Sequence, residues 1–167
     1  MATIRPVIRD LERSTIDRVL EILAAFGVFA LLAVAGVYYS RLPNSIPTHF
    51  NFSGEPDAWG AKTSVLATPL IGAVVYAALT VLSRFPHVFN YPWAITESNA
   101  RRQYTLSRRM VSAMKLELVL SFAYMTWSTI RTALGSRMGL SPFFTVLQIP
   151  VLAVIIGYYV MKARREA

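Results

Sequence analysis

Four side chains within nine positions are the best candidates for chemistry in this sequence. They are His49, Asn51, Glu55 and Asp57. Imidazole, amide and carboxylate groups are ligands for zinc and other divalent ions. A closed zinc site takes four ligands, whereas this segment supplies three at best, and the second histidine, His87, is expected on the opposite side of a membrane. A calcium loop is excluded, because Pro56 and Lys62 occupy its glycine and terminal glutamate positions.

Three roles for this segment are left open. In the favoured one the residues are structural: Asp57 and Asn51 accept hydrogen bonds from backbone N–H groups of a turn, and His49 bonds a neighbouring carbonyl. The others are recognition of an external ligand and binding of a metal. We expect no metal and no other cofactor; bound metal that disappears in His49→Ala would contradict this expectation.

The rest of the chain offers little for catalysis. It has no cysteine, and neither histidine has the nearby arrangement of acid and nucleophile that is typical of catalysis. Walker loops, HExxH, GxSxG and haem-attachment motifs are all absent from the sequence. We therefore expect no catalytic residue and a protein that is not an enzyme, with a metal-assisted hydrolase as the least favoured alternative.

Composition indicates how the candidate residues are positioned. Of 167 residues, 54% are hydrophobic and 16% charged, whereas soluble domains carry about 25% charge. Four stretches have the roughly 20 apolar residues needed to cross a bilayer. They are residues 19–39, 64–83, 111–130 and 142–161, separated by an outer loop at 40–63 and a cytoplasmic connection at 84–110. The predicted fold is all-α, a four-helix bundle forming one transmembrane domain over 1–167.

The basic residues predict the orientation of this domain. Lys and Arg are retained on the cytoplasmic side of membranes, and 13 of the 17 in this chain fall in alternate segments. The 13 are Arg5, Arg9, Arg13, Arg18, Arg84, Arg101, Arg102, Arg108, Arg109, Lys115, Lys162, Arg164 and Arg165; the other four are Arg41, Lys62, Arg131 and Arg137. Both termini are therefore expected in the cytoplasm. This topology explains the charge of +8 without nucleic acid.

The third helix is expected to be long. Thr96 can cap a helix that runs from Glu97 to Leu134, about 57 Å, so that about five turns protrude into the cytoplasm. Its arginines are expected to contact anionic lipid head groups. They are Arg101, Arg102, Arg108 and Arg109. Within the span, Glu117 needs a partner, and we expect an ion pair with Arg84, with a proton or substrate pathway as the alternative.

The outer loop carries the most specific pattern in the sequence. Prolines 43, 47 and 56 stiffen it, residues 48–52 are expected to form a short strand, and residues 53–56 a turn. Its segment LPNSIPTHFNFSGEPDAWGAK resembles the signature of domain of unknown function 1648 (DUF1648), a family related to the N-terminal part of SdpI-type bacterial immunity proteins. The resemblance implies a multi-pass protein of the bacterial inner membrane, with an immunity or sensing role.

We expect the protein to act by binding or assembly. The loop would supply the recognition surface, with helix faces containing Gly27, Gly36, Gly72 and Gly157 available for close contacts. The expected recognition residues are His49, Phe50, Asn51, Gly54, Pro56, Asp57, Trp59 and Lys62. The expected partners are an external peptide, other membrane subunits or a self-oligomer. The alternative function is that of an accessory structural subunit of a larger membrane complex.

Overall fold

The computed structural model describes residues 5–8, 10–135 and 139–167. Arg9 and Arg137, both used in the charge comparison, lie outside the described residues. The elements are α1 (Thr15–Tyr39), β1 (Ser45–Phe50), β2 (Pro56–Ala61), η1 (Lys62–Leu66), α2 (Ala67–Leu82), η2 (Pro86–Val88), α3 (Ala100–Ala133) and α4 (Pro142–Arg165). The described chain is thus mostly helical, with a small sheet that an all-α prediction did not include.

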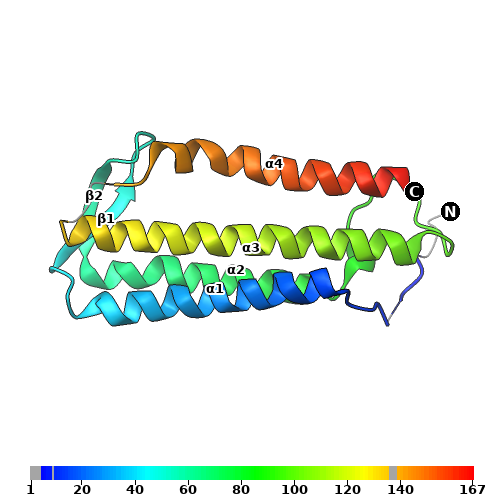
Figure 1. Cartoon of the computed structure of the whole chain (residues 1–167), viewed down its shortest axis with the longest axis horizontal. Coiled ribbons are helices and arrows are strands. Elements are labelled where there is room, and N and C mark those ends of the chain that lie inside the picture. Colours follow the sequence, from blue (N-terminus) through cyan, green and yellow to red (C-terminus); the bar gives the residue numbers. More distant parts are fainter. Residues whose placement is uncertain (1–4, 9, 136–138) are drawn as a thin grey trace.

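The helices lie side by side with their long axes in a similar direction (Figure 1). α3 occupies the middle and contacts α1, α2 and α4. The two strands lie at one end of the molecule, which we call the sheet end (Figure 1). The start of α1, the start of α3 and the end of α4 lie at the opposite end, which we call the far end (Figure 1).

Three segments are long and apolar enough to cross a membrane. They are α1, the run Lys62–Leu82 and α4. α3 is not among them, because it carries arginines in its first turns and Lys115 and Glu117 further along. The crossing by α3 and the cytoplasmic side of the termini therefore stay predictions.

Small residues bring the helices close together at two points. A Cβ on Gly27 would lie 2.7 Å from Val119 Cγ1, and one on Gly72 would lie 2.8 Å from Leu31 Cδ2. These distances are below van der Waals contact, so α1 approaches α3 and α2 only because the positions are glycine. Gly36 and Gly157 have no atom of the described parts of the chain within 4 Å of such a Cβ, so close helix contacts do not depend on them there.

α3 is long, as expected, but it begins three residues later than predicted and ends one residue earlier. Its 34 residues span about 51 Å at the standard rise. Asn99, and not Thr96, is its N-cap, and the Asn99 Oδ1 accepts the Thr96 backbone N–H at 2.9 Å. Its first turns are covered by other parts of the chain: Tyr104 Oη donates to the Pro6 carbonyl at 2.9 Å.

The outer loop is ordered by an antiparallel pair of strands. β1 and β2 pair Ser45 with Ala61 and Pro47 with Trp59. The first strand begins three residues before the predicted one, and the second strand was not predicted. The pairing register shifts on both sides of His49, and such bulges re-aim the side chain of the bulged residue.

Candidate functional site

A pocket lies between the outer loop and the helices α3 and α4 at the sheet end. Its volume is about 410 Å³, within the range of small-ligand sites. The lining consists of His49, Phe50, Asn51, Phe52, Asp57, Met125, Leu140, Phe144, Thr145 and Gln148. Residues from the loop motif therefore form one wall, and residues from two helices far along the chain form the other.

At the mouth of the pocket, a histidine and a carboxylate are paired. His49 Nδ1 lies 2.6 Å from Asp57 Oδ1, with the two side chains 69% and 44% exposed. The expected partner of His49 was a backbone carbonyl, and this prediction is wrong, because the strand pairing brings Asp57 within reach. Among the described residues, no group of three or more His, Asp or Glu side chains could hold a metal ion.

The turn between the strands is held by Asn51 and Gly54. Asn51 Oδ1 accepts the Glu55 backbone N–H at 3.0 Å, as the structural role predicted. Gly54 has φ +81, and its carbonyl accepts the Leu140 N–H at 2.7 Å. A Cβ on Gly54 would lie 2.1 Å from the Leu140 carbonyl oxygen. The turn therefore packs directly on the backbone that leads into α4, and this contact closes one side of the pocket.

The pocket contains some of the predicted recognition residues and not others. His49, Phe50, Asn51 and Asp57 line it. Gly54 is not part of the lining, but its carbonyl accepts the N–H of Leu140, which lines the pocket. The remaining three lie outside the lining: Pro56 begins β2, Trp59 is 56% exposed, and Lys62 Nζ lies 5.3 Å from the centre of the Tyr39 ring.

Next to the pocket, polar side chains of α3 and α4 form hydrogen bonds with one another. Ser121 Oγ lies 2.9 Å from Glu117 Oε1 and 2.6 Å from Gln148 Oε1. One hydroxyl proton cannot serve two acceptors, so the Gln148 amide is assigned with its NH₂ group donating to Ser121. Glu117 Oε2 and Thr145 Oγ1 are buried and have no hydrogen-bond partner among the residues that the structure describes. Unpaired buried polar atoms are rare in folded proteins.

Sequence reasoning missed the helix wall of the pocket. A signal was present: Glu117, Ser121 and Met125 are four residues apart and therefore share one face of α3. Gln148 interrupts an otherwise apolar span, but sequence alone did not assign it a partner.

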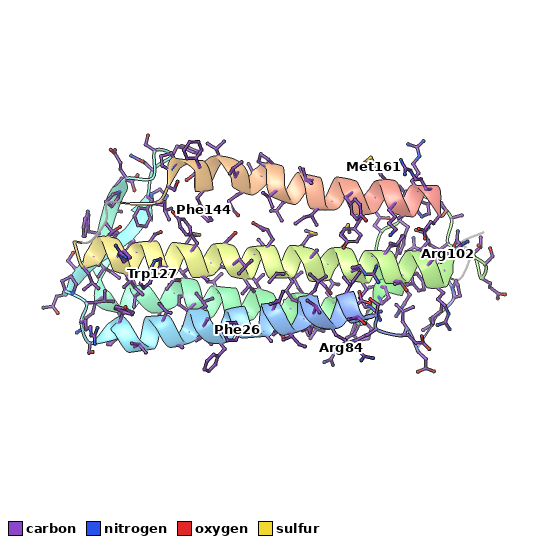
Figure 2. All side chains as sticks on the ribbon, in the orientation of Figure 1. Phe26, Arg84, Arg102, Trp127, Phe144 and Met161 are labelled. Atoms are coloured by element: carbon purple, nitrogen blue, oxygen red, sulfur yellow. The ribbon has the colours of Figure 1, made fainter. Side chains whose placement is uncertain are left out.

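The expected ion pair between Glu117 and Arg84 is not among the ion pairs that the described residues form. Lys115 takes the buried pairing instead, with Nζ 2.6 Å from Glu21 Oε2 and 2.9 Å from Thr80 Oγ1. Lys115 faces α1 and α2, whereas Glu117, two residues on, faces α4, as residues two apart on a helix do. Arg84 is exposed beyond the end of α2 (Figure 2).

Two of the four expected head-group arginines are engaged inside the protein. Arg108 is 8% exposed, and its Nη1 donates to the Leu11 carbonyl at 2.7 Å. Arg109 Nε donates to Asp17 Oδ1 and Nη2 to Ser14 Oγ, both at 2.9 Å. Through these contacts, the segment before α1 and the first turn of α1 are bound to α3. The sequence did not predict this attachment. Arg101 and Arg102 are exposed, and Arg101 Nη1 also donates to the Asp10 carbonyl at 3.3 Å.

Nearby, burial raises the pKa of Tyr91, in the connection between α2 and α3, to about 12, although its hydrogen bond with Ser107 acts in the opposite direction. The Tyr91 hydroxyl is therefore protonated at neutral pH and donates to the Pro86 carbonyl at 2.8 Å. Ser107 Oγ of α3 lies 2.7 Å from the same Tyr91 hydroxyl, so Tyr91 links η2 to α3.

Comparison with known proteins agrees with the loop motif. One similar protein, an uncharacterised protein of Archaeoglobus fulgidus, is 29% identical over 129 residues, covering 69% of each chain. No solved structure matches the chain. The family model described as domain of unknown function (DUF1648) matches residues 26–73, which run from within α1 through both strands into α2. Residues 26–73 are therefore a DUF1648 domain, as the outer-loop motif predicted.

Proposed function

We propose that this protein is a noncatalytic, four-crossing membrane protein that binds an external peptide in the pocket between its outer loop and α3–α4. One observation carries the proposal: residues of the DUF1648 motif form a wall of a ligand-sized pocket whose other wall comes from outside the motif. An immunity or sensing role, implied by the SdpI-type resemblance, is the biological setting that we propose for this binding.

The packing of α3 supports a fourth crossing. α3 lies between α1, α2 and α4, so neighbouring helices shield its polar side chains from lipid (Figure 1). Lys115 has no exposed side-chain surface and is neutralised by Glu21. Charged groups within membrane spans usually face protein and pair in this way. The helix that is too polar to qualify alone can therefore cross within this assembly.

The lining supports a peptide with apolar side chains. Phe50, Phe52, Met125 and Phe144 supply apolar walls, and Thr145 and Gln148 supply hydrogen-bonding groups. The described lining contains one carboxylate, Asp57, and neither Lys nor Arg. A neutral or basic peptide segment with an aromatic or aliphatic side chain matches this chemistry.

Photo-crosslinking at adjacent positions tests the proposal. p-Benzoylphenylalanine replaces Phe144, which lines the pocket (Figure 2), or its neighbour Phe143, which is 77% exposed and outside the lining. Irradiation of the host cells is expected to give a discrete peptide adduct at 144, identified by mass spectrometry, and lipid adducts alone at 143. The same lipid adducts at both positions would contradict peptide binding.

A groove on α2 favours accessory-subunit function as the second candidate. Val74, Ala77, Ala78 and Val81 line an open apolar groove on the face of α2, and small residues allow another membrane helix to approach closely. Purification in mild detergent distinguishes the two functions. A foreign subunit that copurifies stoichiometrically and is lost in Ala78→Leu would favour assembly, and a bound peptide without such a subunit would favour recognition.

A further inference from the structure

A second cavity lies at the far end, between the start of α3 and the end of α4. It has a volume of about 240 Å³ and combines Arg101, Arg102, Thr105 and Arg109 of α3 with Lys162 and Glu166 at the end of α4. Four cations therefore surround one carboxylate. From the sequence, the arginines were expected on a lipid-facing helix, and a contribution of Lys162 to the same site was not predicted.

The two walls of this cavity are fixed relative to one another. Gln103 is fully buried, and its Nε2 donates to the Ala163 carbonyl at 2.8 Å. Arg109 is held from the other side by Asp17 and Ser14. The Gln103–Ala163 bond sets the spacing of α3 and α4, so the two helices do not move apart to relieve the mutual repulsion of the basic groups.

The cavity carries an excess of positive charge, which favours the binding of an anion. Like charges that line one cavity repel each other even where water screens them. Asp17 pairs with Arg109 and Glu166 offsets one further charge, so two of the four positive charges have no carboxylate to balance them within the lining. Guanidinium groups match the oxygens of phosphate with paired hydrogen bonds, and a lysine adds a point charge. A phosphate group bound here would contact both helices at once.

We propose that this cavity binds a phosphate-bearing anion, from a lipid head group or from free phosphate, which links the start of α3 to the end of α4. The surroundings favour the lipid source. Met161 and Tyr158, exposed at 60% and 53%, precede Lys162 on the side of the apolar span, so acyl chains would contact them while the phosphate enters the cavity. Figure 2 shows Arg102 and Met161 at this same end.

The experiment compares two variants that alter the cavity with two that do not. Arg102→Gln and Lys162→Gln remove cavity charges, whereas Arg84→Gln and Arg165→Gln remove exposed charges outside the lining. Each protein is placed in nanodiscs of phosphatidylcholine with or without phosphatidylglycerol, and bound lipids are counted by native mass spectrometry. A parallel series in detergent uses inorganic phosphate, with the thermal unfolding midpoint as the readout.

The proposal expects a retained phosphatidylglycerol or a phosphate-dependent rise of the unfolding midpoint in the unmodified protein. Each cavity variant is expected to weaken that binding about tenfold, and each control variant less than about twofold. An effect in nanodiscs alone identifies a lipid source, and an effect in detergent identifies a free anion. Equal losses in cavity and control variants, or no anion dependence in either series, would overturn the proposal.

Discussion

Gly54 positions the outer loop through backbone contacts that leave no space for a side chain. Its positive φ places the carbonyl toward the Leu140 N–H, and the space beside its Cα is filled by the Leu140 carbonyl. Any L-residue at this position would be strained in conformation and would also collide with the neighbouring backbone. The loop and α4 are thus coupled through one residue, and the pocket depends on that coupling.

Gly54→Ala is expected to separate the turn from the start of α4. The left-handed conformation costs about 1–2 kcal/mol for a residue with a Cβ, and the contact with Leu140 adds to this. Amide hydrogen exchange at Leu140, whose N–H bonds the Gly54 carbonyl, should accelerate at least tenfold. Ser53→Ala, at an exposed neighbour, should leave the exchange unchanged; equal acceleration in both variants would contradict the mechanism.

At the scale of helices, the Lys115–Glu21 pair holds α3 against α1 and α2. Tyr76 Oη also donates to Glu21 Oε1 at 2.8 Å, and Lys115 Nζ lies 4.8 Å from the centre of the Tyr76 ring. Three helices therefore contribute to one polar cluster. Removal of one charge from such a buried pair leaves the other without compensation.

Lys115→Met is expected to lower the free energy of unfolding by about 3–5 kcal/mol, because Glu21 is left unpaired. The double variant Lys115→Met with Glu21→Gln should recover most of this loss, since the uncompensated carboxylate is gone. The free energies of unfolding of the single and the double variant are measured in mixed detergent micelles, with circular dichroism as the readout. Glu117→Gln serves as the control on the same helix and should change stability by less than about 1 kcal/mol; an equal loss there would refute the specific pairing.

Close packing of α1 gives a separate prediction. Gly27→Ala places a methyl group against Val119, which is fully buried, and should destabilise the protein by about 1–3 kcal/mol. Gly36→Ala, in the same helix with open space around it, should be neutral or slightly stabilising because alanine favours helix. The thermal unfolding midpoints of the two variants in one detergent decide between these outcomes.

The elements that sequence predicted well are those in which local composition decides the result. Three apolar helices and the long α3 were expected, because spans and helices depend mainly on runs of residues. The second strand and the His49–Asp57 contact were missed, since they depend on a pairing between segments. The partner of Glu117 was misassigned for the same reason: sequence spacing gave its face on α3, but not which helix covers that face.

At the scale of the whole molecule, the arrangement agrees with the predicted separation of charges. Asp17, Arg108 and Arg109 form their contacts at the far end, whereas the sheet and its pocket lie at the other end. Lipid head groups are therefore expected near the second cavity, and an external ligand near the first. The two proposed sites would lie on opposite sides of one membrane.

The absence of cysteine makes this topology directly measurable. Ser53→Cys, Ser98→Cys and Ala167→Cys each introduce a single thiol at an exposed position: the loop turn, the connection before α3 and the end of the chain. If all four helices cross, a membrane-impermeant maleimide added to intact cells labels position 53, and it labels positions 98 and 167 only after the cells are permeabilised. If α3 does not cross, position 167 lies on the opposite side from 98 and only one of these two is protected, so the pattern at 98 and 167 alone decides whether the polar helix spans the bilayer.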